Sequence, residues 1–140
     1  MKRKLFLSVC ISMLLLSVAC NKYKDGPALS LRSKTERVAN SWKVGQALDN
    51  GDDVTSSYNK FELDLSKGGS ASLSAEYNFF GNDYKYTTSG SWAFVSNKEK
   101  LSLDFDNDAG DNVYRILRLK EKEMWLKDDD GSLELHLVPR

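Results

Sequence analysis

The chain has 140 residues, which suits a single domain, and its apolar fraction of 41% and charged fraction of 29% are ordinary for a folded domain. Its 20 basic and 20 acidic residues give a net charge of zero, which excludes a strongly basic nucleic-acid-binding protein on bulk charge. One His and two Cys supply too few soft ligands for a zinc site. We therefore expect no cofactor, no metal centre and no nucleic-acid partner.

Residues 1–19 have the pattern of a secretion signal. Three basic residues, Lys2 to Lys4, precede an apolar stretch at residues 5–16, and small residues follow it up to Cys20. A retained transmembrane helix is the alternative. The apolar stretch is shorter than the roughly 20 residues that a membrane span needs, so a cleaved signal is favoured.

The segment LSVAC, which ends at Cys20, resembles a bacterial lipobox, although Leu16 stands one position earlier than the usual leucine. The resemblance implies that Cys20 becomes the first residue and carries acyl chains, palmitate among them. Asn21 follows the cysteine, which favours the outer membrane of a Gram-negative cell. Residues 20–31 then form the lipidated Cys and a flexible tether, on the periplasmic or the cell-surface side. Residues 32–140 form the domain.

A short helix and eight strands are predicted in that domain. Ser33 and Glu36 form a capping box, which predicts a helix over Thr35–Asn40. Apolar residues then alternate along successive segments, as they do in strands with one buried face. The predicted strands are Trp42–Leu48, Phe61–Leu65, Ala71–Tyr77, Tyr84–Phe94, Leu101–Phe105, Val113–Leu119, Met124–Lys127 and Leu133–Leu137.

The breaks between these strands are short, apart from Asp49–Ser57, and short breaks require antiparallel neighbours. Eight strands in meander order predict an all-β, up-and-down barrel, because pairing the first strand with the last removes both edges. A sandwich would need a long crossover. The phase of Val113–Leu119 changes within the strand, which indicates a β-bulge. We expect a monomer.

This order of elements resembles the lipocalin-like fold, and more closely the small lipocalin-like (calycin-type) lipoproteins of Gram-negative bacteria. Asn40 stands where lipocalins have Gly, and the helix that follows the barrel is missing. The resemblance implies binding and not catalysis. The resemblance rests on the segments Asn40–Val44, Phe61–Leu63 before Lys67–Ser70, Gly90–Trp92 before Leu101–Leu103, and Ile116–Leu119 before Met124–Leu126.

The connections of a meander alternate between two ends, and the two sets differ in charge. One set joins the helix and tether and is expected to face the membrane. It is on balance basic, with Lys67, Lys98, Lys100, Lys120 and Lys122 against Glu99, Glu121 and Glu123. The other set defines an acidic end, and we expect it to attract cations or a basic protein, although Asp is also common in turns for structural reasons. The acidic end contains Asp49, Asp52, Asp53, Asp83, Asp106, Asp108, Asp111, Asp128, Asp129 and Asp130, and no Lys or Arg.

Aromatic residues gather near the acidic end, and bulky residues at the other end form a floor, with Trp42 as its main member. An eight-stranded barrel is either filled by its own side chains or holds one small ligand. The alternatives are a packed core with Tyr at the rim, or a shallow aromatic pocket for a small apolar or cationic molecule. The residues expected to point inward there are Tyr58, Tyr77, Phe79, Phe80, Tyr84, Tyr86, Phe105 and Tyr114.

Catalysis is not expected. The single His136 alternates with Leu135 and Leu137, so it should face solvent and not build a Ser-His-Asp unit. Asp104–Asp108 begins like a calcium-binding EF-hand loop, but Gly110 and Arg115 depart from that pattern. The sequence predicts a lipid-anchored envelope protein that binds a small apolar or cationic ligand. The alternatives are a protein-binding module, such as an inhibitor of a basic lysozyme-like enzyme, and a structural spacer.

Overall fold

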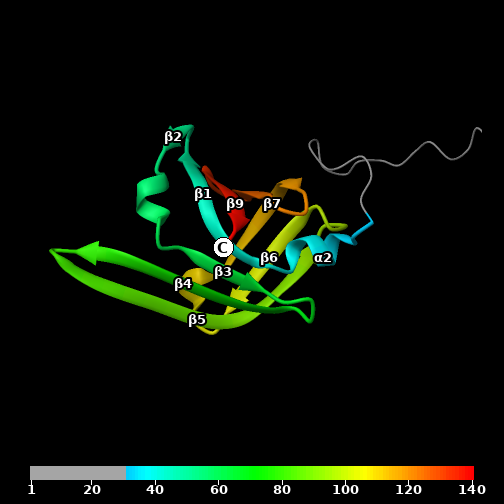
Figure 1. Cartoon of the computed structure of the whole chain (residues 1–140), viewed down its shortest axis with the longest axis horizontal. Coiled ribbons are helices and arrows are strands. Elements are labelled where there is room, and N and C mark those ends of the chain that lie inside the picture. The colour runs from blue at the N-terminus through cyan, green and yellow to red at the C-terminus, as the bar shows by residue number, and fades with distance from the viewer. Residues whose placement is uncertain (1–30) are drawn as a thin grey trace, which may run out of the picture.

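The computed structural model of the chain describes residues 31–140 (Figure 1). The predicted signal, Cys20 and nearly all of the tether lie outside these residues. Over the described range, no helix is long and apolar enough to cross a membrane.

Helix α2 (Lys34–Val38) begins at the predicted capping box. The Ser33 backbone N–H donates to the Glu36 carboxylate at 2.9 Å, and the Glu36 N–H donates to the Ser33 hydroxyl at 3.2 Å. The helix ends before Asn40, because Ala39 already has an extended backbone. Val38 is fully buried, so the last turn of α2 packs onto the barrel.

All eight predicted strands are present, together with a two-residue strand, β2, inside the break that was expected to be a loop. Two short 3-10 helices, η1 (Thr55–Tyr58) and η2 (Asp108–Gly110), interrupt the connections. The strands are β1 (Ser41–Asp49), β2 (Asp52–Asp53), β3 (Glu62–Leu65), β4 (Ser70–Phe79), β5 (Asn82–Val95), β6 (Lys100–Phe105), β7 (Asn112–Leu119), β8 (Met124–Asp128) and β9 (Leu133–Pro139).

Strand β2 exists because Asn50 and Gly51 form a two-residue turn with φ values of 51° and 90°. Positive φ at both positions is what a type I′ hairpin turn requires, and Asn-Gly is the pair that adopts it best. The sequence analysis missed this signal.

The sheet closes as predicted. Its order runs from β1 through β3 to β9 with antiparallel neighbours, and β9 pairs back onto β1 from Trp42↔Pro139 to Asp49↔Leu133. The register shifts between Ile116 and Arg118, which confirms the bulge expected in β7. A second shift, between Val44 and Gln46 in β1, was not predicted.

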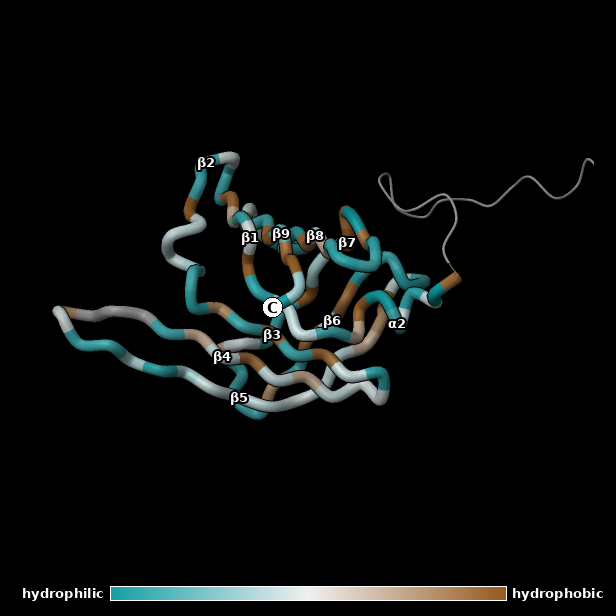
Figure 2. Tube along the Cα trace, viewed as in Figure 1, coloured by the Kyte–Doolittle hydropathy of each residue, from teal (hydrophilic) through white to brown (hydrophobic). Residues whose placement is uncertain are grey.

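The core is a single cluster inside the barrel, and Figure 2 shows apolar residues alternating with polar ones along the strands that enclose it. Trp42, the predicted floor residue, is fully buried, and its indole N–H donates to the Val38 carbonyl at 2.8 Å. The largest fully buried side chains are Trp42, Leu63, Leu101, Leu119, Met124, Leu126, Leu135, Leu137 and Val38. The barrel interior is therefore occupied by its own side chains.

One hairpin extends past its neighbours. Strands β4 and β5 pair along their whole length to the turn at Phe80 and Gly81, but β3 pairs with β4 only as far as Ser74. On the other side, β6 pairs with β5 only from Gly90 onward. We call residues 75–88 the β4–β5 arm, and Figure 1 shows it projecting beyond the rest of the barrel.

Candidate functional site

The helix closes the end of the barrel that was predicted for it. The Arg37 guanidinium donates to the Leu119 carbonyl at the end of β7 (3.0 Å), and Lys67, in the β3–β4 turn, lies 3.4 Å from Glu36. The turn at the tip of the β4–β5 arm and the β1–β2 hairpin lie away from α2, at the opposite side of the molecule (Figure 1). Two connections of the acidic set therefore lie opposite the helix.

Several aspartates at the acidic end hold turns together. Asp53 accepts from the Thr55 N–H at 2.9 Å, Asp111 from the Phe105 N–H at 2.6 Å, and Asp128 from the Asp130 N–H at 3.2 Å. Hydrogen bonds from the side chain and the backbone of Thr55 lower the pKa of Asp53. These contacts agree with turn chemistry as one reason for the aspartates.

The charge separation between the two ends is incomplete. Lys100, assigned to the basic set, lies 2.7 Å from Asp129, assigned to the acidic end, and Arg115 lies 3.4 Å from the same carboxylate. Lys100 opposes Arg115, and Arg115 opposes Lys127. The first residue of β6 therefore lies at the same level along the barrel axis as the end of β8. Neighbouring strands of a barrel are staggered, and this stagger brings the two sets of connections into contact here.

Residues 31–140 contain no group of three or more His, Cys, Asp or Glu side chains placed to hold a metal ion. The Asp104–Asp108 stretch does not form one calcium loop, because β6 continues through Phe105 before η2 begins at Asp108.

Two of the predicted aromatic residues, Tyr58 and Tyr114, pack against the core, and each has a carboxylate near enough to influence its pKa. Burial raises the pKa of Tyr114, a hydrogen bond with the Asn112 side chain lowers it by a smaller amount, and the charges of Asp128 and Tyr58 raise it. Burial also raises the pKa of Tyr58, with a smaller contribution from Asp49. Asp128 is the cross-strand partner of Tyr114, so both side chains lie on the same face of the sheet. We call these four residues the Tyr58–Tyr114 site.

Other predicted aromatic residues serve to cover the core. Phe105 is 3% exposed, and the Tyr86 hydroxyl donates to the Asn107 carbonyl at 3.4 Å. A Cβ on Gly110 would come within 2.9 Å of the Phe105 ring and 3.4 Å of the Tyr86 hydroxyl. Helix η2 therefore lies over this part of the acidic end.

The other four predicted aromatic residues lie in the outer part of the β4–β5 arm, beyond Tyr86. The expectation that Phe80 and Tyr84 point inward is wrong, because they are 89% and 46% exposed on a hairpin that leaves the barrel. Tyr77 opposes Tyr84, and Phe79 opposes Asn82 next to the turn; the structure does not describe the side chains of Tyr77 and Phe79. The six residues whose side chains the structure describes thus lie in three places.

His136 is on the outer face of β9, as predicted, but it is largely covered. Its ring stacks on Trp125 at 4.0 Å with an interplanar angle of 8°, and Nε2 lies 2.7 Å from Glu134. Arg118 lies over the same indole ring at 4.5 Å. This arrangement supports the packing of β7, β8 and β9.

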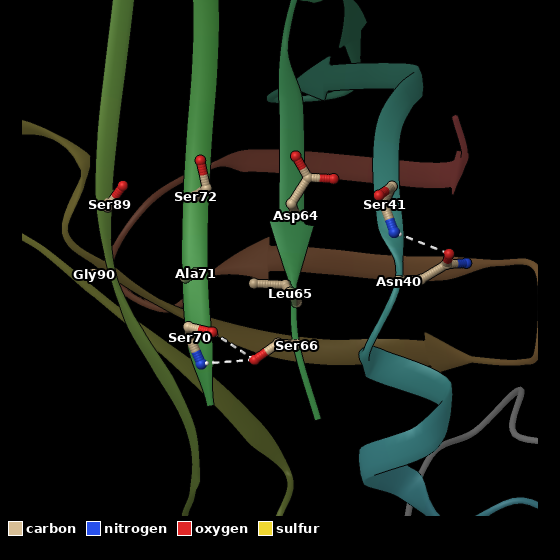
Figure 3. A pocket seen from close by; sticks show the side chains of 10 residues that line it. All are labelled: Asn40, Ser41, Asp64, Leu65, Ser66, Ser70, Ala71, Ser72, Ser89 and Gly90. Carbon is tan, nitrogen blue, oxygen red and sulfur yellow. Dashed lines mark hydrogen bonds between the residues drawn. The ribbon is translucent and has the colours of Figure 1, made fainter. Parts of the chain in front are cut away.

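The sequence analysis missed a shallow groove of about 360 Å³ on the outer face of β1, β3, β4 and β5 (Figure 3). Ser41, Asp64, Ser72 and Ser89 form a row of cross-strand partners there. The sequence signal that could have indicated the groove is the small polar residues at the outward positions of these strands. The lining is Asn40, Ser41, Asp64, Leu65, Ser66, Ser70, Ala71, Ser72, Ser89 and Gly90.

Two solved structures share this architecture. A lipocalin-like protein from Bacteroides uniformis is similar with a TM-score of 0.57 at 13% identity, over 74% of this chain and 99% of that chain. A DUF4847 family protein from Bacteroides vulgatus has a TM-score of 0.51 at 8% identity, over 73% of this chain and 93% of that chain. No protein-family model and no curated protein matches the sequence.

These similarities show the fold. The chain is a closed antiparallel barrel of the lipocalin-like type, which confirms the resemblance seen in the sequence.

Proposed function

We propose that the protein is a non-catalytic binding protein of the bacterial envelope, anchored by lipid, that takes a small cationic ligand with an apolar part at the Tyr58–Tyr114 site. The observation that carries the proposal is the pair of partly buried phenol rings flanked by Asp49 and Asp128. Because the core is filled, the ligand binds at the end of the barrel and not in its centre.

The chemistry of this site suits an organic cation. An aromatic face attracts a positive charge through its quadrupole, and it gives an apolar part a surface to pack against. The Tyr58 ring is also braced by Phe61, at 6.2 Å between centroids in an edge-to-face arrangement. Two carboxylates next to the rings supply the opposite charge.

Calorimetric titration of the full chain with tetramethylammonium, and separately with N-phenyl-1-naphthylamine as an apolar probe, tests this site. We expect binding of the cation to weaken about fivefold in Asp128→Asn and in Tyr58→Ala, since each removes one favourable contact of roughly 1 kcal/mol. Asp106→Asn is the matched control, because Asp106 is an exposed carboxylate at the same end. Absence of heat with both probes, or equal losses in the control, would overturn the site.

The anchor is tested independently at Cys20. The support for it is the basic start, the apolar stretch and the LSVAC segment. In a Gram-negative host fed labelled palmitate, we expect the natural chain to take up label and to sediment with the outer membrane. Cys20→Ser should lose both properties, whereas Cys10→Ser should keep them. Labelling that persists in Cys20→Ser would contradict the proposal.

A protein-binding module is the second candidate, and the exposure of the acidic end favours it. Eight of the ten aspartates there are exposed, all except Asp128 and Asp129. Such a surface steers basic partners, and that attraction falls as salt rises. A pull-down with lysozyme should retain the enzyme at low salt and release it at high salt. Retention that does not depend on salt would reject this candidate. If neither probe nor lysozyme binds, the structural spacer remains.

A further inference from the structure

The β4–β5 arm carries exposed sheet edges, because β3 pairs with β4 only as far as Ser74 and β6 pairs with β5 only from Gly90 onward. Ser89 O accepts from Asp106 N, on the β6 side, whereas Trp92 N donates to Gly69 O, on the β4 side. Odd-numbered residues of β5 therefore direct their backbone groups away from β4. Because β6 joins β5 only from Gly90 onward, no strand of the described chain adjoins Asp83, Lys85 and Thr87 on that side. Such an edge is a template for pairing with another strand.

The turn at the tip of the arm is a second indication that a partner binds outside the barrel. Phe80 and Gly81 are the two turn residues, with φ values of 50° and 79°. Asn, Asp or Gly normally occupies both positions of such a turn, and a bulky side chain is rarely found there. Phe80 is nevertheless 89% exposed, so its large ring buries little within this molecule. A backbone outlier of this kind, at an exposed site, is a reason to look for function.

We propose that the β5 edge of the arm pairs with the same edge of a second copy of this chain, antiparallel, about a two-fold axis at Tyr84. This inference goes beyond the proposed function, does not use the Tyr58–Tyr114 site, and replaces the monomer expected from the sequence with a dimer. In this register Asp83 of each copy opposes Lys85 of the other, and all their edge backbone groups are satisfied. The tip also carries Phe80 toward residues 86–88 of the second copy.

Charge selects this register over its neighbour. Centring the pairing on Lys85 would place two lysines opposite each other, which is unfavourable for cross-strand neighbours. Centring it on Tyr84 makes two Asp83–Lys85 pairs and sets two tyrosines side by side. Within each arm Lys85 already opposes Glu76, which lies 2.8 Å from Lys60, so opposite charges would adjoin across three successive strands.

Disulfide trapping tests the register. In the full chain with Cys10→Ser and Cys20→Ser, kept in mild detergent, Tyr84→Cys should form a covalent dimer on oxidation. The two Cα atoms would lie about 4.5 Å apart in a non-hydrogen-bonded pair, within the range of about 4.4–6.8 Å that a disulfide needs. Thr87→Cys is the matched control, because Thr87 is exposed on the same edge but would oppose Gly81. Equal yields of dimer from the two variants would overturn the proposal.

Charge exchange gives a second measurement by sedimentation equilibrium in the same background. Lys85→Asp or Asp83→Lys alone should raise the dimer dissociation constant about tenfold. Each variant places two side chains of the same charge opposite each other at both symmetry-related pairs of the dimer. The double exchange should restore dimerisation. Circular dichroism and melting temperature monitor the fold of each variant. A double variant no better than either single one would overturn the pairing, as would an arm that binds phospholipid vesicles while the protein stays monomeric.

Discussion

Trp42 joins two parts of the molecule through one side chain. Its ring is fully buried on the floor of the barrel, and its indole N–H is satisfied by Val38, the last residue of α2. A buried donor with a partner adds specificity to an apolar contact, because an unsatisfied donor there would be costly. The tryptophan that opens the first strand therefore fixes both the core and the helix.

We expect Trp42→Ala to lower the free energy of unfolding by about 3–5 kcal/mol, through loss of apolar contact and the cavity it leaves. Urea denaturation followed by circular dichroism measures this change. Trp42→Phe keeps most of the ring and should cost clearly less. A loss below about 1 kcal/mol in the alanine variant would show that the floor repacks.

At Gly90 the backbones of β5 and β6 approach each other closely. A Cβ built there would lie 2.0 Å from the Asp104 carbonyl oxygen and 2.6 Å from the Phe105 Cα. Both contacts are to backbone, which cannot move aside without separating the strands.

Gly90→Ala should therefore destabilise the protein by about 1–3 kcal/mol or more, as overpacking does. Gly68→Ala is the control, because the nearest atom to its Cβ would be the Ser66 hydroxyl at 3.8 Å. Thermal melts of the two variants should differ clearly, and equal melting temperatures would contradict the close approach.

At the scale of the element, α2 is a five-residue helix that depends on its capping and on its contacts with the barrel. Such a short helix is not stable alone. Hydrogen bonds from the Ser33 backbone, from the Ser33 side chain and from Lys67 lower the pKa of Glu36 below its usual value of 4.5.

A lowered pKa predicts a pH dependence of known sign. The stabilisation is present above the unfolded pKa and is lost as pH falls through the lower folded pKa. We expect hydrogen exchange at the amides of α2, relative to its intrinsic rate, to increase below about pH 4 while the strands remain protected. Glu36→Gln should remove this dependence, because the amide caps the helix without titrating. Equal acid sensitivity in the glutamine variant would assign the effect to other groups.

The strands also show which features of the fold can be predicted from the local pattern of apolar and polar residues. Alternation located all eight long strands and the bulge in β7, because each depends on which neighbouring residues share a face. The Asn50–Gly51 turn was a readable signal, since its residue types favour a hairpin directly. In contrast, the cover that η2 places over Phe105 depends on contacts between distant residues, which periodicity does not report.

At the scale of the whole molecule, closure is the contact with the greatest separation in sequence. Strand β9 pairs with β1 across nearly the entire domain, and the Arg140 N–H donates to the Ser41 carbonyl at 2.9 Å. Without β9, the barrel would expose the edges of β1 and β8 and open its core to water.

Deleting residues 133–140 should therefore abolish cooperative unfolding and produce aggregates, which size-exclusion chromatography and near-ultraviolet circular dichroism detect. Deleting Arg140 alone is the control. It removes exposed ion pairs to Glu62 and Asp64, which contribute at most about 1 kcal/mol. A soluble, cooperatively folded chain without β9 would show that closure is not needed.

The amino-acid sequence by itself determined the order, the number and the inward faces of the long strands, and hence a meander that closes. It also determined the start of α2, because a capping box is a contact between near neighbours. Only the tertiary structure decided how the strands are staggered. That stagger brings Lys100 to Asp129, leaves the β4–β5 arm outside the barrel and separates the aromatic residues into three groups. Alternation specifies which face of a strand is buried, whereas the stagger depends on which residues of different strands oppose each other.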